Sequence, residues 1–224
     1  MRILIVSGAG GGTSKKSVGK YFHLKDCGDA LRKYDVDYKL VNELDYFIGF
    51  PTKSLRKYFS SKKKLNELIS EFEPDAVLVD RQSNFGLEII KKGIPLFVLL
   101  RGHYWSEIEY AKNTIYKGKI MRKIVDIGAD IAEQVFAGST EILPICKYLK
   151  DVVKEHHPTQ KSNVFIEGVD DKKWYKTEGM ELKHPCVGML QDANWWRKTK
   201  EMLTLEKVIE RMPNMHFYWA GDGQ

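Results

Sequence analysis

The regular alternation of short apolar segments with amphipathic ones constrains the fold more than any other feature of this sequence. Residues 2–7 are apolar nearly throughout, as expected of a central parallel strand that is buried on both faces. Further strands are expected at residues 38–41, 76–79, 94–100, 132–136 and 163–166. Because helical segments separate them, these strands predict a parallel sheet with right-handed crossovers and helices on both faces. We therefore expect an α/β fold built on a Rossmann-like, doubly wound parallel sheet.

The segments between these strands carry the periodicity of amphipathic helices. The first helix follows a glycine-rich turn at residues 8–14 and runs through Val18 to Leu31. Further helices are expected at residues 53–72, 87–92, 108–125 and 144–155. A strand, a glycine-rich turn and a helix in succession form an arrangement that can cradle a phosphate, since glycine lets backbone N–H groups approach an anion.

A polar stretch at residues 171–183 interrupts this pattern and is interpreted as a linker. After it the pattern restarts, with strands at residues 186–190 and 216–220 and a helix between them. We therefore expect a first domain at residues 1–170 and the start of a second Rossmann-like domain at residues 184–224. Two strands and one helix cannot cover both faces of a parallel sheet. We therefore expect that the chain is an inactive fragment, or that something else completes it.

Composition narrows the possible classes of protein without choosing among them. The chain has 224 residues, of which 43% are hydrophobic and 12% aromatic, which is enough for a core and argues against disorder. No apolar run approaches the length of a membrane span, and the apolar run at the start is too short for a signal peptide. Three scattered cysteines fit a reducing, cytoplasmic setting and show no metal-type spacing. A net charge of +6 permits anionic partners of several kinds.

Polar residues follow several of the expected strands. They are the glycine loop, Arg101 with His103, Ser139, and Glu167 with Gly168. In open α/β sheets, ligands bind beyond the carboxyl ends of the strands. These residues therefore predict a ligand site at that edge, although a single histidine after a strand is more often structural than catalytic.

Two cations stand at the start of the helix in the second domain. Arg197 and Lys198 follow the strand at residues 186–190 and oppose the positive end of the helix dipole. An anion held jointly by the cations and the helix N-terminus would remove this conflict. The alternative is that both are solvated surface residues.

Two other short motifs permit different interpretations. Asp35 and Asp37 match the Asp-x-Asp of metal-dependent glycosyltransferases, but they precede a strand and are better explained as a solvated loop. Residues 8–13 approach the dinucleotide-binding Gly-x-Gly-x-x-Gly, with Glu43 as a possible ribose partner, although Thr13 replaces the third glycine. A dinucleotide-binding or non-catalytic Rossmann-like protein therefore remains the alternative.

Taken in order, the motifs resemble those of the GT-B glycosyltransferases, specifically glycosyltransferase family 4. The similarity is carried by residues 1–6 with the glycine loop, 95–103, 129–139, 164–170, 187–199 and 217–223. Three positions depart from the family pattern: Met189 stands in place of a diphosphate-binding arginine, Glu167 in place of an asparagine, and Thr199 in place of a glycine. The family's Glu-x7-Glu donor motif would lie beyond Gln224.

The resemblance implies transfer of a sugar from a nucleotide-sugar donor to an acceptor, with retention of anomeric configuration and without metal or cofactor. It implies that His103 lies near the donor sugar as the catalytic histidine, and that Lys198 neutralises the departing diphosphate. The remaining donor-binding residues that it implies are Gly10, Gly11, Gly12, Ser139, Gly168 and Arg197. The sugar, the nucleotide base and the acceptor are not specified by these motifs.

A basic stretch at the start of the third expected helix suggests a further partner. Its cations are Lys53, Arg56, Lys57, Lys62, Lys63 and Lys64, interleaved with Leu55, Tyr58 and Phe59. A cationic amphipathic helix with aromatic residues can lie on an anionic bilayer, which would place a cytoplasmic enzyme at the inner face of a membrane. The alternative is a solvated helix face. No nucleic-acid recognition motif is present.

Overall fold

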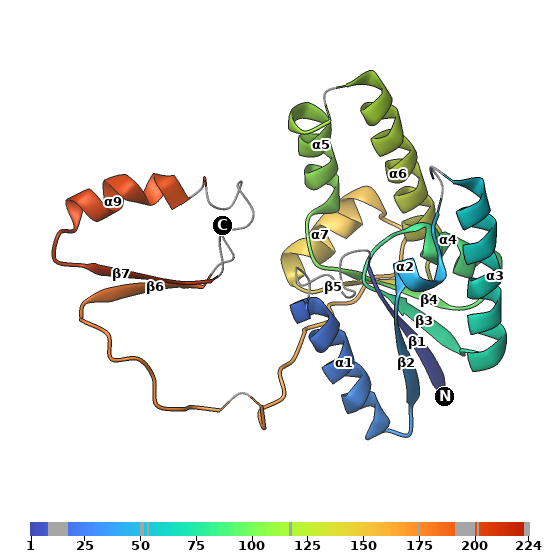
Figure 1. Cartoon of the computed structure of the whole chain (residues 1–224), viewed down its shortest axis with the longest axis horizontal. Helices are drawn as coiled ribbons and strands as arrows, with labels where there is room; N and C mark the ends of the chain where they lie inside the picture. The colour runs from blue at the N-terminus through green and yellow to red at the C-terminus, as the bar shows by residue number, and fades with distance from the viewer. Residues whose placement is uncertain are drawn as a thin grey trace. The chain divides into compact units, whose positions relative to one another are not determined.

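The computed structural model of the chain describes residues 1–8, 18–49, 52, 54–116, 118–173, 175–190, 200 and 202–221. The chain divides into two compact units, Met1–Trp174 and Tyr175–Gln224, and each is described by itself (Figure 1). The first unit is built on a five-stranded parallel sheet in the order β2-β1-β3-β4-β5. Its strands are β1 (Arg2–Ser7), β2 (Asp37–Asn42), β3 (Ala76–Val79), β4 (Leu96–Leu100) and β5 (Glu141–Pro144).

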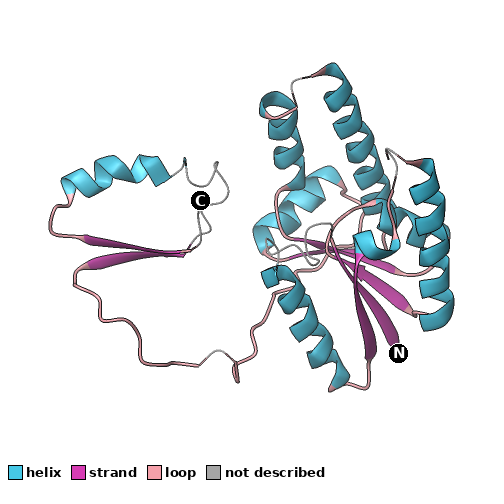
Figure 2. Cartoon of the chain, in the orientation of Figure 1, coloured by secondary structure: helices cyan, strands magenta, loops and turns pink. Residues whose placement is uncertain are grey.

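Helices connect these strands and cover the sheet (Figure 2). They are α1 (Val18–Arg32), α2 (Glu43–Tyr46), α3 (Leu55–Phe72), α4 (Asn84–Lys91), α5 (Tyr104–Thr114), α6 (Lys119–Gly138) and α7 (Lys147–His156). Side-chain caps fix three of their starts: Asn42 accepts a hydrogen bond from the Leu44 N–H, Ser54 from the Lys57 N–H, and His103 from the Ser106 N–H. The predicted α/β class with a Rossmann-like parallel sheet is confirmed.

Both faces of the sheet bury apolar side chains, because successive residues of each strand point to opposite sides. On one face, Leu4, Val77 and Val98 belong to a large core with residues of α3, α4 and α6. On the other face, Ile5, Leu78 and Leu99 form a smaller core around Leu24 of α1. Every one of these strand residues is at most 7% exposed, as the sequence pattern predicted.

The sequence prediction is wrong between residues 108 and 144. The strand expected at 132–136 lies inside α6, where Ala132, Val135 and Phe136 are buried at the i, i+3, i+4 spacing of a helix face. The strand is instead β5, which begins at the charged Glu141 and was therefore missed. The single helix expected at 108–125 is two helices, with Gly118 as the N-cap residue of the second.

The strand expected at 163–166 is present only as extended backbone running parallel to β5. One isolated parallel bridge joins Ile142 to Ser162. The Asn163 N–H then donates to the Ile142 carbonyl at 3.3 Å, and the Phe165 N–H donates to the Pro144 carbonyl at 2.8 Å. This pairing carries the chain along the edge of the sheet and delivers Glu167 beyond the carboxyl end of β5.

The second unit contains two parallel strands, β6 (Cys186–Leu190) and β7 (His216–Ala220), in which Cys186 pairs with His216. Both strands match their predicted bounds. Between them the structure describes a short 3-10 helix, η1 (Leu203–Leu205), followed by α9 (Glu206–Arg211). The helix start that carries Arg197 and Lys198 lies outside the described residues.

Candidate functional site

Three charged side chains from three parts of the sequence meet at the carboxyl edge of the sheet. Asp80 directly follows β3, Arg101 directly follows β4, and Glu167 ends the segment that runs along β5. The Arg101 Nε lies 3.1 Å from Asp80 Oδ1, and the Arg101 Nη2 lies 2.5 Å from Glu167 Oε1. Parallel strands bring these residues together because their carboxyl ends share one edge.

Burial of this cluster costs free energy, because its charged groups are largely removed from water. The side chains of Asp80, Arg101 and Glu167 are 3%, 14% and 29% exposed. The contacts of Arg101 with Asp80 and Glu167 are short enough to be ion pairs. However, the Asp80 Oδ1 and the Arg101 Nε and Nη2 are buried and form no hydrogen bond of good geometry with any described residue. Burial raises the pKa of the Asp80 carboxyl above its usual range, and the guanidinium of Arg101 partly opposes that rise. Such a cluster is poised to accept further polar contacts from a ligand.

Two more cations, Lys20 and Arg81, lie close enough to Asp80 to act on its charge. A Cβ built on Gly8 would come within 2.8 Å of the Arg81 Cδ, so the arginine side chain lies directly across the point where the loop begins. Lys20 stands near the start of α1. Although much of the Lys20 side chain is exposed, partial burial lowers its pKa, and the positive charges of Arg81 and Arg101 lower it further. Among the described residues neither Lys20 nor Arg81 makes an ion pair with an acid, although the Asp80 charge acts on both at longer range.

His103 caps the start of α5. Its Nδ1 accepts a hydrogen bond from the Ser106 N–H at 3.2 Å, which places the proton of the neutral ring on Nε2, 3.3 Å from the Ser106 Oγ. Its ring also lies near those of Trp105 and Tyr148. Capping of α5 gives His103 a structural role. A second role in binding a sugar stays a prediction.

Ser139 does not lie where the sequence analysis expected it. It precedes β5 instead of following a strand, so it stands at the amino edge of the sheet, opposite Arg101. Its hydroxyl is buried, donates to the Phe136 carbonyl and contacts the Gln160 amide. These contacts give Ser139 a structural role at the amino edge, and the structure does not bring it together with Arg101 and Asp80. The error follows directly from the misplaced strand at 132–136.

Gly168 lies on the expected edge, beside Glu167, and a Cβ there would meet no other atom within 4 Å. Gly10, Gly11, Gly12, Arg197 and Lys198 fall outside the described residues. Asp35 lies in the turn before β2, as expected of a solvated loop, whereas Asp37 is the first residue of β2; both are exposed. Glu43, the possible ribose partner, is only 7% exposed.

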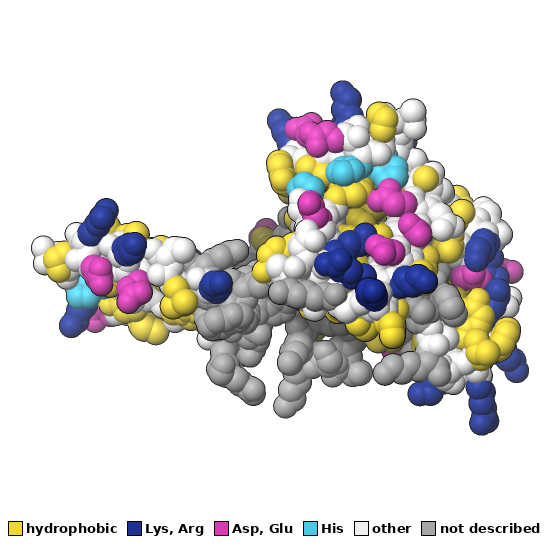
Figure 3. Space-filling model, turned by 90° about the horizontal axis from the view of Figure 1, so that it is seen from above, with side chains coloured by type: hydrophobic (Ala, Val, Ile, Leu, Met, Phe, Trp, Pro, Cys, Tyr) yellow, Lys and Arg dark blue, Asp and Glu magenta, His cyan; other side chains and the backbone are white. Residues whose placement is uncertain are grey.

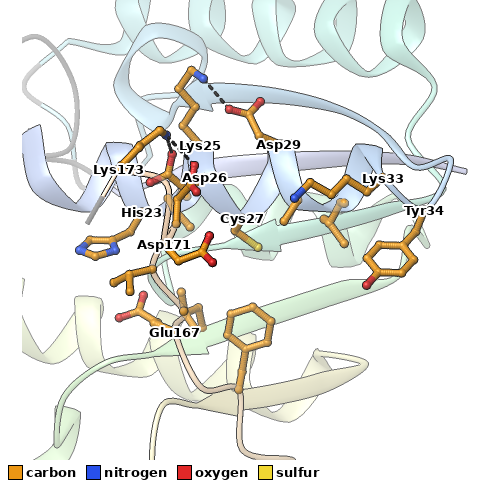
Figure 4. Close-up of a pocket in the computed structure, with 18 of the residues that line it drawn as sticks. His23, Lys25, Asp26, Cys27, Asp29, Lys33, Tyr34, Glu167, Asp171 and Lys173 are labelled. Carbon is orange, nitrogen blue, oxygen red and sulfur yellow. Dashed lines mark hydrogen bonds and ion pairs between the residues drawn. The ribbon is translucent and has the colours of Figure 1, made fainter. Parts of the chain in front are cut away.

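A cavity of about 610 Å³ adjoins the cluster, between α1 and residues 165–173 (Figure 4). Apolar side chains of Leu24, Leu99 and Phe165 form part of its wall, and Arg101 and Glu167 also line it. Charged pairs line the rim, among them Lys25 with Asp29 and Lys173 with Asp26. The Cys27 thiol faces the same space, but burial raises its pKa, which argues against a thiolate nucleophile. The sequence analysis did not predict this cavity.

Within the described residues, no group of three or more His, Cys, Asp or Glu side chains has the geometry to hold a metal ion. No helix in the part of the chain that the structure describes is long and apolar enough to cross a membrane.

Comparison with known proteins shows the fold to be shared at very low sequence identity. No protein-family model matches the chain, and no curated protein matches it in sequence. Sucrose-phosphate synthase from Thermosynechococcus elongatus matches over 100% of this chain and 63% of its own length, with a TM-score of 0.65 and 10% identity. The fold is that of the GT-B class.

Two further structures match less well. UDP-GlcNAc 2-epimerase from Neisseria meningitidis, bound to UDP-GlcNAc, has a TM-score of 0.47 and 15% identity over 100% of this chain and 66% of its own. The corresponding epimerase from Methanocaldococcus jannaschii has a TM-score of 0.46 and 13% identity over 97% of this chain and 65% of its own. The chain thus spans just under two thirds of the length of each of the three structures, and only the first is similar enough to support an argument about fold.

The sequence analysis missed three residues of the candidate site: Lys20, Asp80 and Arg81. The signal for two of them was present, because Asp80 and Arg81 follow an apolar strand just as Arg101 does. Lys20 could not have been found in this way, since its place depends on how α1 packs beside the sheet.

Proposed function

We propose that this chain is the acceptor-side domain and the start of the donor-side domain of a nucleotide-sugar-dependent glycosyltransferase of the family 4 type. The observation that carries the proposal is the match of the whole chain to a sucrose-phosphate synthase structure, together with a charged cluster at the carboxyl edge of the sheet. The name of that protein describes an enzyme of sugar synthesis. The motif series at residues 95–103, 164–170 and 187–199 supports the same reading.

The cluster can perform two tasks in such an enzyme. Arg101 is committed to two carboxylates, so its main effect is to hold the ends of β4 and the 161–167 segment in a fixed relation. Lys20 and Arg81 make no ion pair among the described residues, although the Asp80 charge acts on both at longer range. They can bind a phosphate or another anionic group of a substrate near the start of the glycine-rich turn. The glycine residues Gly10, Gly11 and Gly12 would add backbone N–H donors there.

The donor-side roles rest on the sequence alone. Lys198 and Arg197 would neutralise the diphosphate that leaves as the sugar is transferred, which stabilises charge that develops in the transition state. His103 would contact the donor sugar, and Gly168 would let the backbone approach it. Transfer would retain the anomeric configuration and require neither metal nor cofactor.

A ligand screen by thermal unfolding tests the proposal against its alternative, a dinucleotide-binding or non-catalytic Rossmann-like protein. The probes are UDP-glucose, UDP-GlcNAc, GDP-mannose, ADP-glucose and NAD. A nucleotide-sugar present at 100 times its Kd should stabilise the chain by about 2.7 kcal/mol. Stabilisation by NAD with no response to any nucleotide-sugar would favour the dinucleotide-binding alternative.

A further inference from the structure

The helices α5 and α6 form a hairpin whose tip extends beyond the core of the first unit (Figure 1). No residue of α5 is buried, and the buried residues of α6 all lie in its C-terminal part, beginning at Ala132. The hairpin follows β4, so its tip lies on the side of the carboxyl edge of the sheet. The start of α6 therefore contributes little to the core, and its side chains have another reason to be apolar.

The tip exposes several large apolar side chains together. Ile115 is 57% exposed, Ile120 is 78%, Met121 is 43% and Ile124 is 39%. Ile120 and Ile124 are one helical turn apart, so they lie on one face of α6. Single exposed apolar residues need no explanation, but a group of four at the end of a projecting hairpin marks an interaction surface.

Cations surround this apolar group without acidic residues among them. From residue 111 to residue 125 the sequence contains no Asp or Glu, and it contains Lys112, Lys117, Lys119, Arg122 and Lys123. The nearest acid on the C-terminal side, Asp126, is paired with Lys112 at 2.6 Å. In the described part of the chain, no ion pair neutralises Lys119, Arg122 or Lys123.

We propose that the α5–α6 tip is a docking surface for an anionic lipid bilayer. A projecting, convex tip suits a planar partner, its apolar side chains can enter the interface between headgroups and acyl chains, and its free cations complement acidic headgroups. An acidic protein would attract the same cations, but the exposed isoleucines would then need a matching apolar groove. A bilayer accommodates both the apolar side chains and the cations of the tip, and it needs no preformed apolar groove.

A second surface at the same edge agrees with this orientation. The start of α3 also lies at the carboxyl edge, because α3 connects two parallel strands and so runs opposite to them. There Leu55 is 65% exposed and Phe59 is 66% exposed, next to the exposed cations Arg56 and Lys57. Figure 3, which views the molecule from the side on which the hairpin projects, shows basic and hydrophobic side chains at the surface of the larger unit, with acidic side chains and histidines among them.

Co-sedimentation of the whole chain with vesicles tests the proposal without requiring any enzymatic activity. The vesicles are phosphatidylcholine alone, and phosphatidylcholine mixed with phosphatidylglycerol, at low and high salt. We expect binding to the anionic vesicles that weakens at high salt, with little binding to the neutral ones. Equal binding to both kinds of vesicle, or no binding to either, would overturn the proposal.

Two variants localise the binding. Lys119→Glu with Lys123→Glu should weaken binding about tenfold or more, since each basic residue near an anionic surface contributes substantially. Both glutamates would lie near the N-terminus of α6, where the helix dipole favours them, so the variant should fold. The matched control is Lys150→Glu with Lys154→Glu on α7, which makes the same charge change at the same spacing toward the opposite edge of the sheet. Equal loss in both variants would mean that only net charge matters, which would contradict a local docking surface.

The apolar part has its own control. Ile120→Ser should weaken binding to anionic vesicles, whereas Met180→Ser, at a residue of similar exposure in the other unit, should not. Sedimentation of the chain without vesicles tests whether a second copy of the chain covers the tip instead. A concentration-dependent dimer that Ile120→Ser abolishes would assign the tip to a second copy of the chain and would overturn the bilayer.

Discussion

The Arg101 Nη2 lies 2.5 Å from the Glu167 Oε1, and this contact joins the end of β4 to the last residues of the first unit. The same guanidinium reaches Asp80 beyond β3. One side chain thus ties together three segments of the carboxyl edge, where ligands of open α/β sheets bind. The order of this edge, and with it the shape of the adjoining cavity, depends on Arg101.

Removing the Arg101 charge should destabilise the first unit strongly. Arg101→Gln would leave the buried Asp80 without its cation, and breaking a buried pair from one side costs about 3–5 kcal/mol. Arg2→Gln is the matched control, because the pair of Arg2 with Glu73 is largely exposed and should be worth less than about 1 kcal/mol. Urea unfolding measures both. Similar losses in the two variants would show that the Arg101 cluster is no more than a surface contact.

The pH dependence of stability should carry a contribution from Glu88. Although burial of this carboxyl favours its neutral form, hydrogen bonds and charges of Lys91 and Lys62 lower its pKa below the usual 4.5. Because the folded pKa is lower than the unfolded one, the stabilisation is present above the unfolded value and is lost as the pH falls through the folded value. Glu88→Gln should therefore lower the unfolding free energy at neutral pH. The difference in unfolding free energy between this variant and the wild type should become smaller below about pH 4. A constant difference across the acid range would contradict this assignment.

Substitutions of His103 can separate its cap from a catalytic role. His103→Ala removes the acceptor for the Ser106 N–H and should cost about 1 kcal/mol of stability. His103→Asn keeps a side chain that caps helices well, so it should recover most of that stability. If His103 also contacts the donor sugar, both variants should lose sugar transfer in the complete enzyme. Full activity in the asparagine variant would show that capping is the whole role of this histidine.

Lys198 provides a test of the donor side. Loss of one charged hydrogen bond to a diphosphate should weaken donor affinity by about 1.5–3 kcal/mol in Lys198→Ala. The matched control is Lys207→Ala on α9, at an exposed lysine of the same unit. Calorimetric titration of the nucleotide-sugar measures both affinities. A Lys198 variant that binds as tightly as the control would remove the lysine from the donor site.

The cations of the basic segment of α3 should contribute unequally to the binding of anionic lipid, although the sequence alone does not distinguish them. Lys62 is paired with Glu88 at 3.3 Å and Lys63 with Glu67 at 3.7 Å, so their charges are partly neutralised within the fold. Arg56→Glu with Lys57→Glu should therefore weaken vesicle binding more than Lys62→Glu with Lys63→Glu does. The opposite order, measured by co-sedimentation at equal salt, would contradict this ranking. Lys53 lies outside the described residues.

The sequence predicted the strands that are apolar and closely bounded by polar residues. Residues 2–7, 76–79, 186–190 and 216–220 were assigned as the structure has them, because each is a short run of mostly apolar residues, which is typical of a parallel strand. The same rule failed for β5, whose first residue is Glu141, and misread the apolar stripe of α6 as a strand. Ser139 was consequently assigned to the wrong edge of the sheet.

The candidate site was only partly predictable for a related reason. Residues that follow strands were correctly placed at the carboxyl edge, as with Arg101 and Glu167. The pairing of Arg101 with Asp80 depends on the spatial order of the strands, in which β3 lies beside β4, and no local pattern encodes that order. The cavity beside α1 and the exposed α5–α6 tip depend on packing, which periodicity alone does not determine.

Calorimetric titration of the chain with nucleotide-sugars and with NAD tests the proposed function most directly. We expect saturable binding of at least one nucleoside diphosphate sugar at one site per chain, weakened when Arg81 is replaced by alanine, and no binding of NAD. Saturable binding of NAD in the absence of any response to the nucleotide-sugars would contradict it.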